Sequence, residues 1–334
     1  ITLFKKGDRM CIDNYRTITV VSVFSKIVET CVKKQLLDYF DKYQILSCSQ
    51  FGFRPGYSTV KALDIALTKI LRSFEDHELV GMTLLDLSKA FDRISHGVLL
   101  KKLEYYGINN EQLQFFHTYL CGRLHMVSVG NQISSAKDVL AGVPQGSVLG
   151  PLLFVLYTND LPVNLDCDTI LHADDTSILV NGNCLNKVFN QTNRVINTAN
   201  VWFDSNYLKI NESKTEHIVF TLRQMQIDSK MTKPIKLLGV TIDQKLLWED
   251  HTNNLISKLA RVCFLLRKLK TCVSQELMKM SYFSFFHAHL FYSNILWGGS
   301  TGGERVFYGK KKAIRILFCL GLGVVVRLIF LLII

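Results

Sequence analysis

Residues 168–180 read DTILHADDTSILV, and this stretch decides the expected fold. Two short runs of strand-forming residues, 168–172 and 176–180, flank the acids Asp174 and Asp175, which predicts a β-hairpin with two acids at its turn. Adjacent carboxylates crowd negative charge and leave oxygen atoms free to bind a hard cation. A solvated turn can also hold two acids side by side, so the dipeptide alone does not decide between a metal site and a plain turn.

A third acid, Asp86, follows a separate short apolar run at 79–85 that has the composition of a strand. A carboxylate at the end of a strand is well placed to face a cleft. If Asp86 lies beside Asp174 and Asp175, the three carboxylates converge on two Mg²⁺ ions about 3.5–4 Å apart. Such a pair of ions would activate an attacking hydroxyl group and stabilise a leaving phosphate.

The rest of the chain mixes helices with strands and shows no strict β-α-β order. Helical spacing of apolar residues is found from Asn14 to Gln44, at 58–74, at 97–106 after Ser95, and from Ser147 to about residue 159, while short strands are expected at 124–129 and 136–140. The fold class is therefore expected to be α+β.

The chain has 334 residues, of which 48% are hydrophobic, so it can bury a sizeable core. Lys and Arg total 39 against 28 Asp and Glu, and the formal net charge of +11 favours polyanionic partners such as nucleic acid or anionic lipid. Nine cysteines without a CxxC pair indicate a reducing compartment and no structural zinc. Residues 316–334 are apolar except for Arg327, and they approach the roughly 20 residues that span a bilayer.

A basic amphipathic helix is expected beyond Gly239. Its apolar stripe consists of Leu255, Leu259, Val262, Leu266 and Leu269, and Lys258 and Arg261 are among the cations around it. These cations form either a solvated face or a surface that follows a phosphate backbone.

Seven short blocks along the chain match sequence motifs of one enzyme family. In chain order they are NYR at 14–16, QFGFRPG at 50–56, LDLSKAFD at 85–92, GVPQGSVLGP at 142–151, ADD at 173–175, NESKT at 211–215 and LGV at 238–240. In this order they resemble the blocks of reverse transcriptases, and most of all those of LINE-type non-LTR retrotransposons of the jockey and CR1 kind. Reverse transcriptases of the group II intron (maturase) type share the GFRPG, PQG and ADD elements and are the alternative.

The resemblance implies a right-hand polymerase of the α+β class, with fingers, a palm that carries an antiparallel sheet, and a helical thumb. We expect fingers at 1–80, a palm with embedded fingers segments at 81–240, a thumb with post-thumb helices at 241–300, and a C-terminal tail at 301–334. The apolar end of this tail, 316–334, is unlike the mixed sequence that the family has there. We interpret it as the product of a frameshift rather than as a membrane anchor.

The implied reaction is RNA-directed DNA synthesis. Asp86, Asp174 and Asp175 would be the catalytic, metal-binding acids for two Mg²⁺ ions, which Mn²⁺ could replace, and the Leu87 carbonyl would be a further ligand. The 3′-hydroxyl of a primer would attack the α-phosphate of a deoxynucleotide, and pyrophosphate would leave. Lys214 matches a lysine that protonates the leaving pyrophosphate as a general acid.

Other matching positions are implied to contact the nucleotide. Phe91 would lie under the sugar and disfavour a 2′-hydroxyl, Arg54 would approach the triphosphate, and Gln145 with Gly146 would hold the nucleotide and template. Each position also has a plain structural interpretation, as a core aromatic, a loop arginine or a turn.

Contacts with primer and template are implied at five further residues. His172 precedes the acids, Leu238 and Gly239 match the primer grip, and Lys258 and Arg261 lie on the basic helix expected in the thumb.

The implied partners are an RNA template, a DNA primer or target DNA, and deoxynucleoside triphosphates, whereas contact with a membrane is not expected. The family usually carries an endonuclease N-terminal to this region, so we interpret the chain as a fragment that lacks this domain. The family works in cytoplasmic ribonucleoprotein particles and in the nucleus, and we expect the same of this chain.

Three departures from the family leave rival hypotheses open. His172 replaces the usual Tyr or Phe, Thr17 stands where relatives usually have Pro, and the tail is aberrant. These changes favour a catalytically decayed remnant that at most binds nucleic acid. A binding module without catalysis would not need three acids, and a two-metal nuclease would not need the blocks on the nucleotide side.

Overall fold

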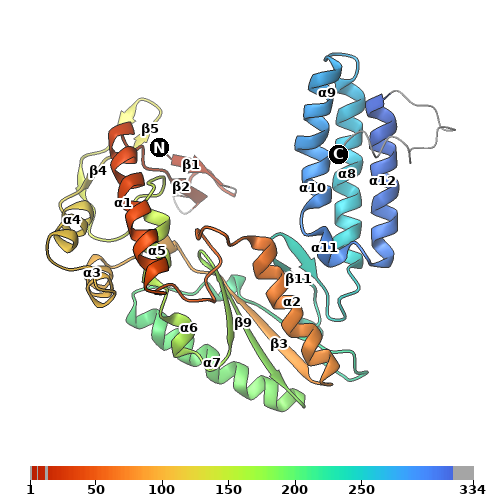
Figure 1. Ribbon diagram of the computed structural model, residues 1–334, viewed down its shortest axis with the longest axis horizontal. Coiled ribbons are helices and arrows are strands. Elements are labelled where there is room, and N and C mark those ends of the chain that lie inside the picture. Colours follow the sequence, from red (N-terminus) through yellow and green to blue (C-terminus); the bar gives the residue numbers. More distant parts are fainter. Residues whose placement is uncertain (1, 6, 12–13, 319–334) are drawn as a thin grey trace. The chain divides into compact units, whose positions relative to one another are not determined.

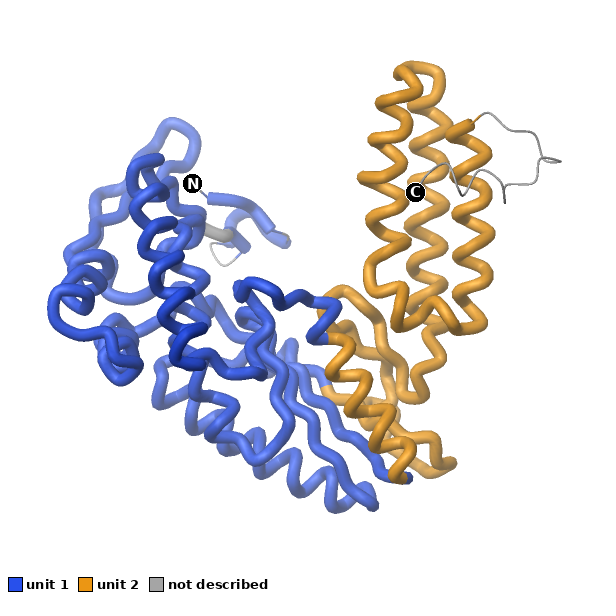
Figure 2. Tube along the Cα trace, in the orientation of Figure 1, with its two compact units in different colours: residues 1–62, 77–216 blue, residues 63–76, 217–334 orange. Residues whose placement is uncertain are grey.

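The computed structural model describes residues 2–5, 7–11 and 14–318, and the chain forms two compact units (Figure 2). Unit 1 comprises residues 1–62 and 77–216, and unit 2 comprises residues 63–76 and 217–334. Unit 1 takes in most of the ranges predicted as fingers and palm. Unit 2 takes in the range predicted as the thumb.

Unit 1 is built on antiparallel strands. Strand β9 (Asp175–Gly182) pairs on one side with β3 (Leu79–Leu85) and on the other with β8 (Asp168–His172) (Figure 1). The predicted hairpin is therefore confirmed, with β9 beginning at Asp175, one residue earlier than expected. The register sets Leu85 opposite Thr176 and His172 opposite Asp175, so the end of β3 and the hairpin turn lie at the same edge.

Helix α7 (Leu185–Ser205) packs against β3 and β9, and the sequence analysis did not identify it. Its buried residues are Val188, Val195, Ala199, Trp202 and Phe203, which recur at helical spacing. Gly81 on β3 lies under Val188, where a β-carbon would come within 2.7 Å of the valine side chain. The strand and the helix therefore pack closely at this glycine.

Helix α5 (Gly150–Tyr157) lies in the core of unit 1, and nearly all of its residues are buried. Ser147 was predicted to cap a helix that reaches about residue 159; the helix begins at Gly150, three residues after Ser147, and ends at Tyr157. The Ser147 hydroxyl accepts a hydrogen bond from the Gly150 N–H at 2.9 Å and donates to the Pro144 carbonyl at 2.9 Å, so it closes the turn before the helix.

The helix expected over 14–44 is shorter than predicted. It is α1 (Val23–Lys42), which begins after Ser22, because the Ser22 side chain accepts a hydrogen bond from the N–H of Ser25 and caps the helix. The residues before it form β2 (Tyr15–Thr17), which pairs with β1 (Thr2–Phe4).

The remaining elements of unit 1 are short. They are the 3-10 helix η2 (Ala90–Asp92), α3 (His96–Tyr105), α4 (Asn110–Leu120), α6 (Leu161–Asn164), the 3-10 helix η3 (Glu212–Lys214), and four two-residue strands, β4 (Leu124–His125), β5 (Ser128–Val129), β6 (Gln132–Ile133) and β7 (Lys137–Asp138). The strands expected at 124–129 and 136–140 are thus divided into two small pairs, β4 with β7 and β5 with β6.

Unit 2 is mainly helical. Besides α2 (Thr59–Glu75), which begins in unit 1, it contains β10 (Glu216–Phe220), η4 (Ser229–Met231), the antiparallel pair β11 (Ile235–Leu237) and β12 (Val240–Ile242), α8 (Glu249–Leu269), α9 (Gln275–Ser281), the π-helix η5 (Tyr282–His287), α10 (Ala288–Phe291), α11 (Asn294–Trp297) and α12 (Thr301–Phe318). Helix α8 buries Leu255, Leu259 and Leu266 of the predicted stripe and packs along α12. A β-carbon at Gly302 on α12 would overlap the side chain of Thr252, so this glycine allows the two helices to approach closely.

The first part of the range predicted as a tail is α12, and the predictions for residues 319–334 lie outside the described residues. In the described part of the chain, no helix is both long and apolar enough to cross a membrane. The eight described cysteines are free thiols.

Candidate active site

The three predicted acids lie at one edge of the unit 1 sheet. Asp86 directly follows the last residue of β3, Asp175 is the first residue of β9, and Asp174 lies in the turn before it. Ala173 has a positive φ of 58°, which turns the chain sharply between β8 and β9. The antiparallel register of β3 with β9 therefore brings together acids that are far apart in the sequence.

The charges of the three acids act on one another. Burial raises the pKa of Asp175, and the charges of Asp174 and Asp86 raise it further, while His172 and Lys214 act in the opposite direction. Desolvation is the largest cause of the raised pKa, and the carboxylates of Asp174 and Asp86 add repulsion that a bound cation would offset. The negative charges at this edge of the sheet therefore favour the binding of a cation.

One cation of the chain already occupies part of this edge. The Lys214 ammonium group donates to Asp86 Oδ2 at 2.9 Å, across 128 residues of sequence. The segment before Lys214 is held against the residues that follow β3. The Ser88 N–H donates to the Lys209 carbonyl and the Asn211 N–H donates to the Asp86 carbonyl, both at 2.8 Å. The lysine is thus positioned by the backbone next to the predicted catalytic acids.

The donor groups fit a hard cation, because the three acids offer only oxygen atoms. Among the described residues, no three His, Cys, Asp or Glu side chains are arranged as a metal site as they stand. Asp86 is paired with Lys214 instead. A metal ion at Asp86 would therefore compete with Lys214 for the carboxylate.

A cavity of about 930 Å³ opens beside the acids. Its lining includes Asp86, Asp174 and Lys214, together with the predicted nucleotide contacts Phe91 and Gln145. Its volume is at the upper end of the range for small-molecule sites. Tyr15 of the NYR block lines it as well, so the cavity joins residues from five of the sequence blocks in one site.

Three cations of this cavity were missed by the sequence analysis. Lys5, Arg9 and Lys89 line it. The signal that could have found the first two is the basic run KKGDR at 5–9, which precedes the first block. Cations opposite a cluster of acids suit a ligand that carries both metal ions and phosphates.

Phe91 is fixed by other aromatic rings. Its ring stacks on Phe154, with the ring centroids 4.7 Å apart and the planes at 29°, and it meets Phe53 edge to face at 6.4 Å. Phe91 is half-buried and lines the cavity. Its ring therefore forms a rigid part of the wall and not only a piece of the core.

The loop with Gln145 and Gly146 is held by neighbouring segments. The Thr19 N–H donates to the Gln145 carbonyl at 2.8 Å. Gly146 has a φ of 111°, and a β-carbon there would lie 2.8 Å from the Thr19 carbonyl oxygen, so only glycine fits without strain. Buried Glu29 on α1 accepts hydrogen bonds from the N–H groups of Val148 and Leu149 at 2.6 and 3.0 Å.

Two other predicted residues of unit 1, Arg54 and His172, do not line this cavity. The Arg54 guanidinium donates to the Ser47 carbonyl at 2.9 Å and lies over the ring of Tyr57 at 4.2 Å, and Arg54 does not line the cavity. Its role at the triphosphate stays a prediction. His172 ends β8, paired with Asp175 in the hairpin.

The predicted primer and template residues of unit 2 lie on separate elements. Leu238 and Gly239 form the turn between β11 and β12, with φ values of 45° and 88°, and the Tyr292 hydroxyl donates to the Leu238 carbonyl. Lys258 and Arg261 are exposed on α8. Tyr292 directly follows α10, and no pattern in the sequence predicted its contact with Leu238.

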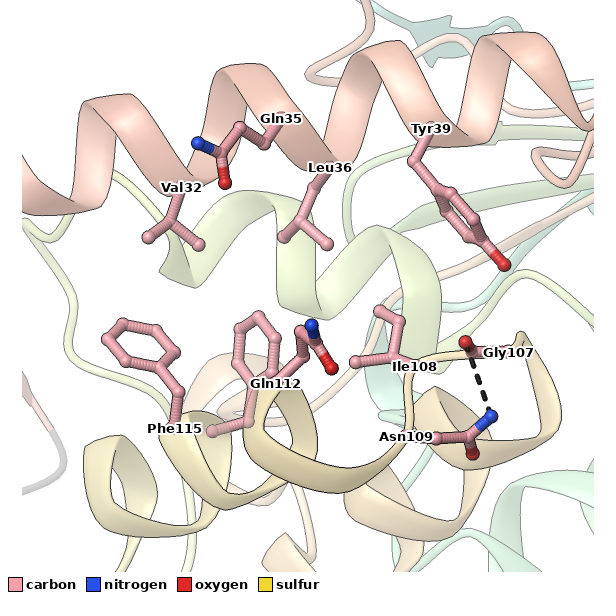
Figure 3. A pocket seen from close by; sticks show the side chains of 10 residues that line it. Val32, Gln35, Leu36, Tyr39, Gly107, Ile108, Asn109, Gln112 and Phe115 are labelled. Atoms are coloured by element: carbon pink, nitrogen blue, oxygen red, sulfur yellow. Dashed lines mark hydrogen bonds between the residues drawn. The ribbon is translucent and has the colours of Figure 1, made fainter.

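A different cavity, of about 440 Å³, lies between α1 and α4 (Figure 3). Apolar side chains such as Val32, Leu36 and Phe115 and the amides of Gln35 and Gln112 line it. Its lining contains no charged residue. A phosphate-bearing ligand therefore fits the cavity beside the acids and not this one.

Residues 4–242 match the family described as reverse transcriptase (RNA-dependent DNA polymerase). This chain belongs to the reverse transcriptase family. It is 36% identical over 250 residues to the probable RNA-directed DNA polymerase from transposon BS of Drosophila melanogaster, which covers 70% of this chain and 26% of that protein. It is 29% identical over 276 residues to the RNA-directed DNA polymerase from mobile element jockey of the same fly, covering 76% and 30%.

These relatives confirm the predicted resemblance to the jockey kind of retrotransposon reverse transcriptase. The chain spans less than a third of the length of each of them. Among solved structures, telomerase from Candida albicans in complex with a fragment of telomeric RNA matches with a TM-score of 0.51 at 13% identity, covering 89% of this chain and 56% of that chain. This likeness confirms the predicted α+β, right-hand polymerase fold.

Proposed function

We propose that this chain is the polymerase part of a non-LTR retrotransposon protein and catalyses RNA-directed DNA synthesis at the cavity of unit 1. The observation that carries the proposal is the convergence of Asp86, Asp174 and Asp175 at one edge of the sheet, with Lys214 bonded to the first of them. Asp86, the hairpin and a lysine from a third segment meet there although the sequence separates them widely. Two-metal nucleotidyl transfer uses this combination of groups.

Each residue of the site has a separate role in the proposed reaction. The three carboxylates would hold two Mg²⁺ ions, which activate the primer hydroxyl and stabilise the charge of the leaving group when bound. Lys214 lies 2.9 Å from Asp86 and can deliver a proton to the departing pyrophosphate. Lys5 and Arg9 line the same cavity and can bind phosphate oxygens. Phe91 presents a fixed ring to the sugar.

The proposed substrates are deoxynucleoside triphosphates on a DNA primer, copied from an RNA template. The excess of 39 basic over 28 acidic residues and the exposed cations of α8 support binding to nucleic acid. In target-primed synthesis the primer end comes from a nick in the target DNA, so we propose that an endonuclease domain of the longer protein supplies it. Cytoplasmic ribonucleoprotein particles and the nucleus are the proposed locations.

Primer extension with the full chain tests this proposal. We expect Mg²⁺-dependent extension of a DNA primer on an RNA template with the parent chain, and none with Asp174→Asn. Asp166→Asn is the matched control, because Asp166 is an exposed aspartate in the loop before β8 and does not line the cavity. If the folded parent chain binds RNA but extends no primer, the decayed-remnant hypothesis replaces the enzyme.

A further inference from the structure

Two segments of unit 1 are locked together beside the cavity. The Val143 N–H donates to the Phe91 carbonyl at 2.9 Å, and the Gly142 N–H donates to the Ile94 carbonyl at 2.8 Å. A β-carbon at Gly142 would lie 2.9 Å from backbone atoms of Asp92, and buried His96 bonds the Gly142 carbonyl at 2.8 Å. The backbones of residues 91–96 and 141–145 therefore have little freedom relative to each other.

A side-chain hydrogen bond completes this arrangement. Gln145 Nε2 donates to Asp92 Oδ1 at 2.8 Å. An ionised carboxylate accepts hydrogen bonds and donates none, so the amide must turn its NH₂ group toward Asp92. The amide oxygen Oε1 then remains as an acceptor for another partner. The Gln145 backbone is held by Thr19, and the hydrogen bond with Asp92 sets the orientation of the side-chain amide.

Asp92 and Gln145 lie where the orientation of the Gln145 amide can affect a bound ligand. Asp92 and Gln145 line both the cavity of about 930 Å³ beside the catalytic acids and a neighbouring cavity of about 570 Å³. The amide therefore stands in the wall between the two cavities. Lys5 and Arg9 line the first cavity and offset the negative charge that Asp92 adds to a site for phosphates.

We infer that Asp92 is a positioning residue, which fixes the Gln145 amide so that the incoming nucleotide always meets the same acceptor and donor. This inference rests on the proposed function and adds a residue to it. Asp92 acts through Gln145 and does not touch the reacting atoms. A free glutamine side chain would have to lose its rotamer freedom each time a nucleotide binds, and the hydrogen bond with Asp92 removes this cost in advance.

A double-mutant cycle in nucleotide kinetics tests the inference. We expect Asp92→Leu to raise KM for the deoxynucleotide about tenfold, the effect of losing one hydrogen bond to a charged group, with little change in kcat. In a Gln145→Ala background the same substitution should change KM by less than about twofold, because the group that it orients is gone. Asp92→Asn should retain the parent KM, since the asparagine oxygen can accept the same bond.

The control is Asp138→Leu, which removes an exposed aspartate on β7 that lines neither cavity. If Asp92→Leu raises KM by the same factor with and without Gln145, the inference is wrong and the polymerase function stands. If the parent chain extends no primer, the proposed function fails, and the following measurement still decides the role of Asp92.

The second measurement needs no activity. In full chain labelled with ¹⁵N-glutamine, the side-chain NH₂ signal of Gln145 is assigned by its loss in Gln145→Ala. We expect its two protons to be well separated and slow to exchange in the parent and in Asp92→Asn, and to move toward the values of free glutamine in Asp92→Leu. An unchanged signal in Asp92→Leu would overturn the inference.

Discussion

Gly52 lies directly against the backbone of Ala173, so closely that a β-carbon on Gly52 would overlap the Ala173 nitrogen. The contact is part of a wider one, since the Phe51 N–H donates to the Leu171 carbonyl and the Leu171 N–H to the Ser49 carbonyl, both at 2.8 Å. The loop with the FGFRPG sequence therefore supports the hairpin turn that carries Asp174 and Asp175. The position of the proposed catalytic acids therefore depends on a segment more than a hundred residues away.

Gly52→Ala is therefore expected to reduce primer extension by about 100-fold, because a displacement of about 1 Å at a catalytic group has this effect. The fold should be retained, since only the turn has to shift. Steady-state extension and circular dichroism measure the two effects. Gly97→Ala is the control, because a β-carbon there meets no atom within 4 Å. Equal activity of Gly52→Ala and the parent would show that the turn is not held by this contact.

Lys214→Gln should lower two quantities, kcat and the Mg²⁺ concentration that gives half-maximal activity. The loss of a general acid lowers kcat, by about 100-fold or more. The Mg²⁺ concentration for half-maximal activity should fall, because the ammonium group no longer competes with the metal for Asp86. A Mg²⁺ titration of primer extension measures both quantities. Lys209→Gln, an exposed lysine in the same segment, should leave both unchanged, and an unshifted Mg²⁺ requirement in Lys214→Gln would show that the lysine does not compete with the metal.

Asp175 should make the metal-free chain less stable at neutral pH. Burial and the neighbouring acids raise its pKa in the folded state, so its contribution to stability is complete below the pKa of the unfolded chain and is lost as the pH rises through the folded pKa. Asp175→Asn should therefore have a higher Tm than the parent at pH 7 without Mg²⁺, with a smaller difference in acid. Thermal unfolding at both pH values measures this, with Asp166→Asn as control. A Tm difference that does not depend on pH would contradict the assignment.

Glu29 is expected to stabilise the loop that carries Gln145. Glu29→Ala leaves two backbone N–H groups without their acceptor, which should lower the free energy of unfolding by about 1–3 kcal/mol. Glu29→Gln should cost less, because its amide oxygen can accept one of the two bonds. Urea unfolding measures the difference, and Lys26→Ala on the exposed side of the same helix is the control. Equal stability of Glu29→Ala and the control would show that Glu29 does not stabilise this loop.

The sequence predicted those parts of the site that local pattern or motif order can encode. The hairpin with Asp174 and Asp175 follows from two short strand-forming runs around a turn, and its register with Asp86 follows from antiparallel pairing. Glu29 could not be predicted, because an acid within a helix indicates an exposed face unless the tertiary contact that buries it is known. The hydrogen bond between Asp92 and Gln145 joins residues 53 positions apart, and no local periodicity marks it.

Phe91 provides the test of substrate choice. Its ring is held between Phe154 and Phe53 and lines the cavity, so it can exclude a 2′-hydroxyl only while it stays rigid. Phe91→Ala should therefore increase the use of ribonucleotides relative to deoxynucleotides by about 100-fold, as the loss of a steric barrier of a few kcal/mol requires. Phe154→Leu should increase it by a smaller factor, because the ring loses its stacking partner but remains in place. The measurement is single-nucleotide extension with each nucleotide in parallel. The control is Phe115→Ala, on α4 at the other cavity, which should keep the parent preference for deoxynucleotides. If Phe91→Ala also keeps this preference, Phe91 is a core aromatic and does not select the sugar.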